Sequence, residues 1–438
     1  MSYHSDRREF LRQAMLAGTT LPWVSKAWAE EKQEASKSPN EKLRVGVVGV
    51  AARGRSNLNG VAGEEVVALC DIDAQRLEQA ATDFPKAKTY GDYRKLLDEQ
   101  KLDCLVVSTP DHMHAFPVVA ALQAGLDVYC EKPMAHSVWE VRQIREWAVK
   151  QKAVTQLGTQ IHNTGDNYRR VVEIVQSGQL GEVNRVHVWL GGGMKVFDKA
   201  ETLEKPPAHV DYDLWVGPSP YRPFSDAHFH FNWRFWWDFG NGALGDFGCH
   251  YMDLPFWALN LPAPATVKTQ GEKGHTGVND CPLDLQVDYH FPLRASGSAV
   301  HLTWYQGKYR PEEFKTYGGG KNSGVLFEGT KGRLLADYSS RKIFMGDGST
   351  PLAPPQSIAP SPGHHAEFLQ AVRTRNVTTC NFHYSGNLTE AVLLGNVSYR
   401  AGNQLLEWDA AELTASNCPQ AAQYIRREYR KGWKLAEA

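Results

Sequence analysis

The fold of this chain is decided by the stretch RVGVVGVAARG, residues 44–54. Its first half is an apolar run typical of a buried strand, and its second half has the pattern Gly-x-Ala-x-x-Gly, a dinucleotide-binding fingerprint with one glycine replaced. Gly49 allows a tight turn, the small Ala51 lets the backbone approach a pyrophosphate, and Gly54 allows the next helix to pack closely. We therefore expect the backbone from Gly49 through Arg53 to hold a pyrophosphate at a helix N-terminus.

Asp71 ends the next apolar run, residues 66–70, and lies 22 residues after Gly49. An acidic side chain at this distance from the fingerprint is expected to bind the hydroxyl groups of the adenosine ribose. A carboxylate at that place repels a ribose phosphate, so the sequence predicts NAD as the cofactor in preference to NADP.

Short apolar runs alternate with helical patterns through residues 43–160, which is typical of βαβ units. Longer, β-branched stretches of alternating polarity follow in residues 161–438. The prediction is an α/β chain with two domains. An N-terminal Rossmann domain with a doubly wound parallel sheet (43–160) precedes a substrate-binding, catalytic α+β domain with an open, mostly antiparallel sheet (161–438).

The first 29 residues are interpreted as a twin-arginine export signal, followed by a linker over residues 30–42. The pair Arg7-Arg8 precedes a modestly apolar stretch, residues 14–23, and Ala27-Trp28-Ala29 offers the small residues of a cleavage site. The alternative is a short amphipathic helix of the mature fold. The stretch is far below the roughly 20 residues that span a bilayer, so we expect an exported, periplasmic or otherwise extracytoplasmic protein without a membrane segment in its mature form.

The composition indicates which partner to expect. The formal net charge is -1 and the pI is about 7.0, so there is no overall basic field to bind nucleic acid. The chain has 13 Trp and 17 Tyr, and aromatic faces stack on the apolar faces of sugar rings. We expect a small carbohydrate as substrate, with ordinary core aromatics as the alternative explanation.

Three further motifs carry a resemblance to a known family. They are STPDHMH at residues 108–114, Glu131-Lys132-Pro133, and GDFGCH at residues 245–250. Together with the fingerprint, they resemble the Gfo/Idh/MocA family of glucose-fructose oxidoreductases and inositol dehydrogenases, over nearly the whole predicted mature chain. The resemblance implies a homo-oligomer, either a dimer or a tetramer.

The resemblance assigns catalysis to Lys132, Asp246 and His250, and these residue types allow that chemistry. Residues four apart share one helix face, so Asp246 and His250 can act together. A histidine can take the proton of a hydroxyl, and a lysine ammonium can stabilise negative charge on the oxygen. The alternative is a structural role, with Asp246 and His250 as a buried pair and Lys132 as a surface charge.

The remaining cofactor contacts are predicted at the carboxyl ends of later strands, where nicotinamide is expected to lie. These residues are Thr109, Pro110, His112, His114, Glu131 and Lys132. The two histidines also permit a metal site. No metal is predicted, and no two cysteines have the Cys-x-x-Cys spacing of a zinc site.

Substrate contacts are predicted at two places. Gln160, His162 and Asn163 follow the last parallel strand, near the domain junction. The aromatic group before Asp246 is interpreted as a sugar platform, with an aromatic core as the alternative; it comprises Trp233, Arg234, Trp236 and Trp237.

Two enzymatic functions and one non-enzymatic function fit these motifs. The leading one is an NAD-dependent oxidoreductase that acts on a secondary hydroxyl of a sugar or cyclitol. The alternative is an NAD-dependent glycoside hydrolase that oxidises the sugar, eliminates the aglycone and returns the hydride. A sugar-binding or scaffold protein that kept the fold is the third. The complete Glu-Lys-Pro segment favours the first, and the export signal favours a tightly held cofactor.

Overall fold

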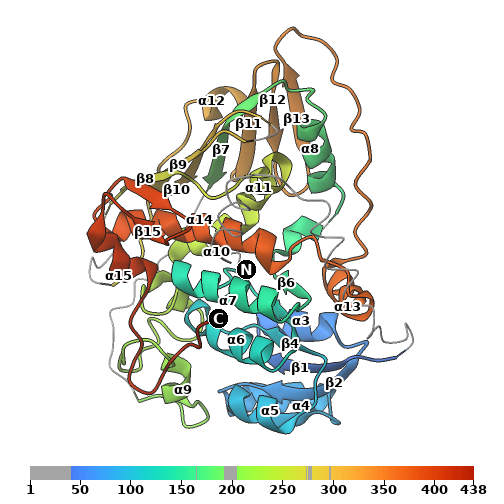
Figure 1. Cartoon of the computed structure of the whole chain (residues 1–438), viewed down its shortest axis with the longest axis vertical. Coiled ribbons are helices and arrows are strands. Elements are labelled where there is room, and N and C mark those ends of the chain that lie inside the picture. Colours follow the sequence, from blue (N-terminus) through green and yellow to red (C-terminus); the bar gives the residue numbers. More distant parts are fainter. Residues whose placement is uncertain (1–40, 164, 192–204, 273, 275–278, 295–296) are drawn as a thin grey trace, which may run out of the picture.

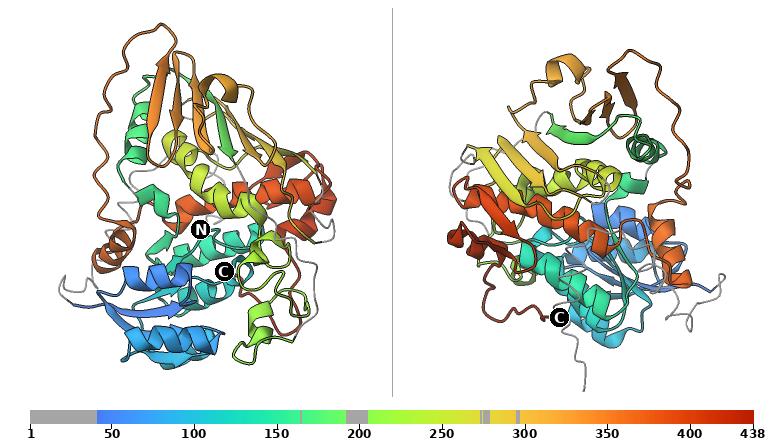
Figure 2. Two further views of the ribbon diagram at one scale, coloured as in Figure 1. Left: turned by 180° about the vertical axis from the view of Figure 1, so that it is seen from behind. Right: turned by 45° about the horizontal axis from the view of Figure 1, so that its top comes forward.

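The computed structural model describes residues 41–163, 165–191, 205–272, 274, 279–294 and 297–438. Two β-sheets lie at opposite ends of the molecule, with helices between them (Figures 1 and 2). The predicted export signal and all of the linker except residues 41 and 42 lie outside the described residues. Among the described residues, no helix combines the length and apolar composition that crossing a membrane requires.

The first sheet has six strands in the order β3-β2-β1-β4-β5-β6, all parallel. Its strands are β1 (Arg44–Val48), β2 (Glu65–Cys70), β3 (Lys88–Tyr90), β4 (Cys104–Val107), β5 (Asp127–Cys130) and β6 (Thr155–Leu157). The helices along this part of the chain are α3 (Arg53–Gly60), α4 (Ala74–Asp83), α5 (Tyr93–Glu99), α6 (Ala115–Gln123) and α7 (Val138–Lys150). The strand order reverses at β1, and ligands of such sheets bind at the strand carboxyl ends near the reversal.

A helix from late in the chain completes the core of this first domain. α13 (His364–Thr374) places Phe368 and Val372 against Val45 and Val47 of β1, and all four side chains are buried. The first domain is therefore built in space from two separate parts of the sequence.

The second sheet has nine strands in the order β13-β12-β11-β7-β10-β9-β8-β14-β15. Among the described strands, β7 and β10 pair in parallel and every other pair is antiparallel, which confirms the predicted mixed, mostly antiparallel sheet. Its strands are β7 (Val183–Leu190), β8 (Thr266–Gly271), β9 (Leu285–Phe291), β10 (Val300–Gln306), β11 (Gly324–Gly329), β12 (Gly332–Ala336), β13 (Arg341–Met345), β14 (Leu406–Asp409) and β15 (Thr414–Ala415).

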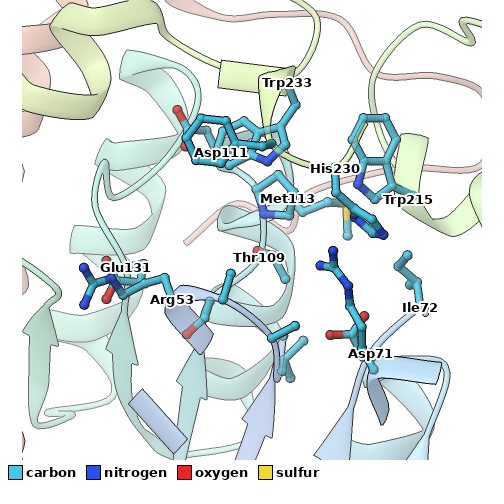
Figure 3. A pocket seen from close by; sticks show the side chains of 18 of the residues that line it. Arg53, Asp71, Ile72, Thr109, Asp111, Met113, Glu131, Trp215, His230 and Trp233 are labelled. Carbon is cyan, nitrogen blue, oxygen red and sulfur yellow. The ribbon is translucent and has the colours of Figure 1, made fainter. Parts of the chain in front are cut away.

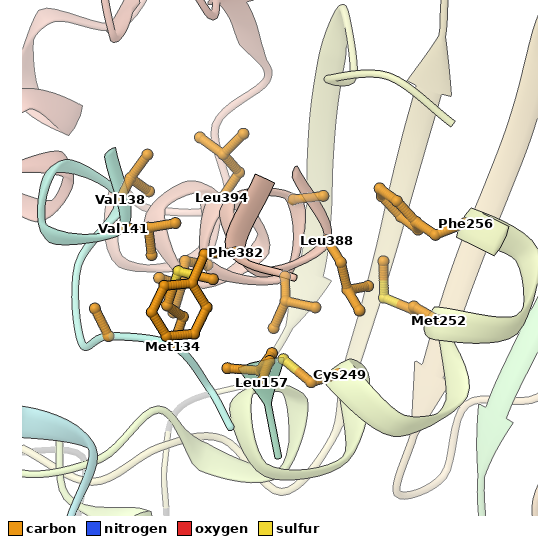
Figure 4. Close-up of a cluster of buried hydrophobic side chains, with 14 of the residues drawn as sticks. Met134, Val138, Val141, Leu157, Cys249, Met252, Phe256, Phe382, Leu388 and Leu394 are labelled. Atoms are coloured by element: carbon orange, nitrogen blue, oxygen red, sulfur yellow. The ribbon is translucent and has the colours of Figure 1, made fainter. Parts of the chain in front are cut away.

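Three helices fill the space between the sheets: α10 (Gly242–Tyr251), α11 (Asp253–Leu259) and α14 (Phe382–Arg400). Figure 4 shows their apolar side chains packed against those of the first domain in one continuous cluster. It contains Met134, Val138, Val141 and Leu157 on one side and Cys249, Met252, Phe256, Phe382, Leu388 and Leu394 on the other. This shared core fixes α10 over the carboxyl ends of the parallel strands.

A buried ion-pair group lies beside this cluster. Glu390 of α14 accepts hydrogen bonds from Arg142 Nη2 (3.1 Å) and Arg145 Nη1 (2.9 Å) of α7. Burial by itself would raise the pKa of Glu390, but the two guanidinium groups outweigh burial and lower it. The carboxylate is therefore ionised and joins the two domains electrostatically.

Candidate active site

A cavity of about 700 Å³ crosses the carboxyl ends of the parallel strands. Its lining includes the fingerprint turn and Asp71 on one side and residues of α10 on the other. Figure 3 shows Trp215, His230 and Trp233 across the cavity from Asp71 and Ile72. The cavity therefore lies where the sequence predicts the dinucleotide.

The turn after β1 has the geometry that the fingerprint predicts. Gly49 has a φ of 83°, and a Cβ on Gly49 would lie 2.5 Å from the carbonyl oxygen of Ser108. A Cβ on Gly54 would lie 2.0 Å from the carbonyl oxygen of Gly49, so α3 begins directly against the strand end. No side chain caps α3, which leaves its first N–H groups for a phosphate.

Asp71 is held by the backbone on both carboxylate oxygens. Its Oδ2 accepts a hydrogen bond from Val50 N (3.0 Å) and its Oδ1 from Asp73 N (3.0 Å). Burial raises the pKa of Asp71, and the two N–H groups act against that rise. Each oxygen keeps a second lone pair that can accept a ribose hydroxyl.

Two buried polar atoms on the cavity lining support the fit of a dinucleotide. Within the described part of the chain, Thr109 Oγ1 and His250 Nδ1 have no hydrogen-bond partner. Burying such atoms without partners costs free energy, so a polar ligand that bonds them is favoured. With the cradle at Gly49 and the carboxylate of Asp71, the residues present suit NAD.

Lys132 and Asp246 meet inside the cavity although they are 114 positions apart in sequence. Lys132 Nζ donates to the Asp246 carboxylate and to its backbone oxygen, the latter at 2.9 Å. Arg234 Nε lies 3.6 Å from the same carboxylate. Burial by itself would raise the pKa of Asp246, but Lys132 and Arg234 outweigh burial and lower it, so the carboxylate is ionised.

His250 lies one helical turn after Asp246 and also lines the cavity. Burial lowers its pKa to about 3, and the charge of Lys132 acts in the same direction. The imidazole is therefore neutral at neutral pH. The structure thus brings together the three residues predicted for catalysis.

Asp111 is a buried residue of the cavity lining that the sequence reasoning did not select. Its Oδ2 accepts a hydrogen bond from Asn241 Nδ2 at 3.1 Å. Burial raises its pKa to about 7, although Lys132 and Arg234 oppose the rise. The signal was available, since Asp111 is the acidic residue of the motif at residues 108–114.

Two residues predicted to contact the cofactor, His112 and His114, lie behind the cavity lining. The ring nitrogens of His112 lie 2.7 Å from the carbonyl oxygen of Trp215 and 3.2 Å from that of Phe239. Those of His114 lie 2.7 Å from the carbonyl oxygens of Pro133 and Thr109. Burial lowers the pKa of both histidines, to about 3 and about 4, so each ring is neutral and its single N–H donates to one of its two carbonyl oxygens. Neither histidine lies on the cavity lining, so both act by fixing neighbouring loops.

Glu131 reaches the cavity wall from β5, together with Pro110 and Arg53. Its Oε1 accepts hydrogen bonds from Asn57 Nδ2 (2.9 Å) and Tyr129 OH (3.2 Å). Burial raises the pKa of Glu131 despite these bonds. The carboxyl group therefore braces the turn that carries Lys132.

The residues predicted to contact substrate after β6 lie at the junction of the two domains and make hydrogen bonds there. Gln160 accepts from Arg53 Nη1 at 2.8 Å. His162 Nδ1 lies 2.8 Å from Asp253 Oδ2, and Asn163 donates to Glu367. None of the three lies on the described lining of the cavity.

The predicted sugar platform is divided between cavity and core. Trp233 and Arg234 line the cavity, and the Arg234 guanidinium lies 4.2 Å from the centre of the Trp233 ring. Trp236 packs in a buried aromatic cluster and donates from Nε1 to the carbonyl oxygen of Ala227 (3.1 Å). Trp237 is also buried.

One side of the cavity is lined by a segment of which the sequence predicted only the aromatic group at its end, residues 233–237. We call residues 205–239 the covering segment; it contains α9 (Tyr212–Val216). Hydrogen bonds join it to the loop after β2. Ala74 N donates to the carbonyl oxygen of His209 (2.8 Å), and Asp211 N donates to that of Ile72 (2.9 Å). His230 Nε2 bonds Asp73 Oδ2 at 3.1 Å. These bonds hold the aromatic residues of the segment over the cofactor site.

Comparisons with known proteins agree with this geometry. Residues 43–159 match the oxidoreductase family with an NAD-binding Rossmann fold, and residues 164–291 match the C-terminal alpha/beta domain of the same family. Inositol 2-dehydrogenase of Salmonella typhimurium is 33% identical over 151 residues, which is 33% of this chain and 45% of that protein. The match thus spans less than half of that relative.

A longer match and the solved structures extend the similarity over both domains. Levoglucosan dehydrogenase of Pseudarthrobacter phenanthrenivorans is 24% identical over 299 residues, 62% of this chain and 65% of that protein. The WlbA dehydrogenase of Bordetella pertussis, solved with NADH and UDP-GlcNAcA, superposes with a TM-score of 0.63 at 17% identity, covering 84% of this chain and 99% of that one.

A solved levoglucosan dehydrogenase with NADH and levoglucosan superposes with a TM-score of 0.56 at 16% identity, covering 84% of this chain and 99% of that one. Similarity at this level of identity establishes the fold, whereas the matched family domains establish the lineage. On the evidence of both domains, this chain belongs to the Gfo/Idh/MocA family of NAD-binding oxidoreductases.

Proposed function

We propose that this chain uses NAD to oxidise a secondary hydroxyl of a sugar or cyclitol. The observation that carries the proposal is the meeting of Lys132, Asp246 and His250 in the cavity that also holds the fingerprint turn and Asp71. A hydride acceptor and a proton acceptor then lie in one enclosed space. The names of the similar dehydrogenases support a carbohydrate substrate.

The side chains divide the reaction between them. Bound NAD supplies the hydride acceptor. Neutral His250 is placed to take the hydroxyl proton, so that the alcohol loses a proton and a hydride and becomes a ketone. The Lys132 ammonium stabilises the negative charge that grows on the oxygen, and Asp246 fixes that ammonium in place.

Two observations favour a glycoside hydrolase as the second candidate. Asp111 gives the cavity another titratable group, with a pKa of about 7, as an elimination step requires after transient oxidation. The covering segment lines the cofactor site with Trp215, His230 and Trp233, which suits a hydride that is returned before products leave. The complete Glu-Lys-Pro segment keeps the dehydrogenase in first place.

We further propose that the protein is exported through the twin-arginine route and carries its NAD with it. Folding before export would allow an enclosed nucleotide to travel with the chain. Retention in the nanomolar range corresponds to about 12 kcal/mol of binding free energy. The family resemblance also supports a homo-oligomer.

The deciding experiment is an incubation of purified protein with NAD and a panel of sugars, cyclitols and aryl glycosides. Absorbance of reduced nicotinamide and release of aglycone are followed in the same samples. A dehydrogenase accumulates reduced nicotinamide, whereas a hydrolase releases aglycone without net reduction. If neither signal appears with any substrate while NAD binds, both enzymatic functions are contradicted.

A further inference from the structure

The C-terminal segment, residues 426–438, returns from the second domain to the first. Its end lies beside α6 and α7 (Figure 1). Trp147 Nε1 donates to the carbonyl oxygen of Ala436 (3.1 Å), Ala438 N donates to Gln143 Oε1 (2.9 Å), and Leu435 is 3% exposed. The segment is therefore docked on the first domain by both polar and apolar contacts.

Two arginines of this segment connect it with α7, with the segment around His112 and with α9. Arg427 pairs with the buried carboxylate of Glu140 on α7 at 2.8 Å and donates to the carbonyl oxygen of His112 at 2.6 Å. Arg430 donates to the carbonyl oxygens of Gly217 (3.0 Å) and Asp213 (3.0 Å) at α9. The C-terminal segment thereby ties the covering segment to the first domain.

Trp433 extends from the C-terminal segment to the cavity lining. Its ring packs edge-to-face on Phe116, with 5.2 Å between ring centres, and the Arg94 guanidinium lies 5.4 Å from its centre. These contacts fix the ring in one orientation at low entropic cost. Trp433 shares the lining with Gly91 after β3 and Leu214 of α9.

The strand order identifies which half of the cofactor lies near Trp433. The pyrophosphate belongs at the fingerprint after β1, and Asp71 after β2 marks the adenosine ribose. Lys132 after β5 marks the nicotinamide side. Arg94, which contacts the Trp433 ring, belongs to α5 after β3, and β3 lies beyond β2, so Trp433 lies at the end of the cavity that remains for adenine.

We propose that Trp433 forms one wall of the adenine site, so that the C-terminal segment retains the cofactor. The proposal rests on the NAD binding of the proposed function and requires nothing of the substrate. Trp433 lies outside the matched family domains, which end at residue 291. An aromatic ring on the cavity lining suits contact with a flat purine base.

The test compares three ligands on full-length protein that has been freed of nucleotide. Calorimetry measures binding of NAD, ADP-ribose and nicotinamide mononucleotide to wild type and Trp433→Ala. From the binding free energy of one base–aromatic stacking contact, we expect Trp433→Ala to lower the affinity for NAD and for ADP-ribose by about 5- to 100-fold. Binding of nicotinamide mononucleotide, which lacks adenosine, should be unchanged.

Matched variants separate this contact from general damage. Trp433→Phe keeps a ring and should stay within about threefold of wild type. Leu352→Ala removes an apolar side chain that is 73% exposed and outside the cavity lining, and it should bind all three ligands normally. Should Trp433→Ala fail to fold, Trp433→Leu, which fills part of the volume without a ring, is measured in its place.

Unchanged NAD and ADP-ribose affinity in the ring-deleting variant would overturn the proposal, as would an equal loss for nicotinamide mononucleotide. No sugar is present in these assays. A chain that binds adenosine through Trp433 but oxidises no sugar would therefore contradict the proposed function and leave this inference standing.

Discussion

Lys132, directly after β5, donates hydrogen bonds to both the carboxylate and the backbone carbonyl of Asp246 on α10, so one ion pair joins the two domains inside the cavity. Domain packing thereby fixes the position of the ammonium relative to His250. A change in how the two domains pack would therefore displace the catalytic residues even where each domain stays folded.

Removing the ammonium or the imidazole should abolish turnover without releasing the cofactor. For Lys132→Met and for His250→Ala we expect turnover to fall by at least about a hundredfold, because charge stabilisation and proton transfer each contribute at that level. Calorimetric NAD affinity should stay near wild type, and Lys132→Arg, which keeps the charge, should retain more activity than Lys132→Met. Loss of NAD binding in step with activity would show that these side chains are structural.

Replacing Asp71 should weaken NAD more than NADP. The carboxylate accepts from the backbone at Val50 and Asp73 and is placed for ribose hydroxyls, so Asp71→Ala removes that acceptor and its repulsion of a ribose phosphate together. The ratio of the two dissociation constants, measured by nucleotide fluorescence titration, should shift toward NADP. An equal loss for both nucleotides would contradict the assignment.

The stability of the protein should depend on pH through Asp111. Because burial raises its folded pKa to about 7, the folded state holds this proton more strongly than the unfolded state, and the stability linked to it is lost as pH rises from about 4 through 7. The side chain of the Asp111→Asn variant cannot ionise, so the variant does not lose this stability as pH rises. Its free energy of unfolding minus that of wild type should therefore increase by about 1 to 4 kcal/mol between pH 5 and pH 8. Parallel curves of unfolding temperature against pH, measured without nucleotide, would contradict this.

Breaking the interdomain ion pair at Glu390 should strongly destabilise the fold. Glu390→Gln leaves Arg142 and Arg145 buried beside a neutral amide, and removing one partner of a buried pair typically costs about 3 to 5 kcal/mol. The matched control is Glu272→Gln, which breaks the pair with Lys308 where both side chains are more than half exposed, and should have a much smaller effect on stability. Denaturant unfolding measures both, and equal effects would show that burial does not set the energy.

The export proposal is tested at its two arginines. Replacing Arg7 and Arg8 by lysine should leave folded precursor in the cytoplasm, as cell fractionation and immunoblotting would show. Wild-type protein purified without added nucleotide should release close to one NAD per chain on denaturation. Export that is unchanged by the double substitution would contradict the route, and an empty purified protein would contradict cofactor retention.

The sequence by itself determined the features that depend on neighbouring residues. Gly49 and Gly54 dictate a strand that turns at once into a helix, because Gly49 has a positive φ and a Cβ on Gly54 would collide with the carbonyl oxygen of Gly49. Asp71 follows at the distance that one βαβ unit imposes, and Asp246 and His250 share a face because the helical repeat places them so. Hydrophobic alternation was likewise enough for the two sheet types.

Only the tertiary structure decided which long-range neighbours these segments meet. α13 completes a core that begins some 300 residues earlier, and Trp433 reaches a cavity built from residues of the first domain. His162 and Trp236 have residue types that suit a sugar site. In the folded chain, however, His162 lies at the domain junction and Trp236 packs inside a buried aromatic cluster. A local pattern fixes the backbone conformation, whereas the side-chain environment depends on which distant surfaces bury the most apolar area and satisfy the most polar groups.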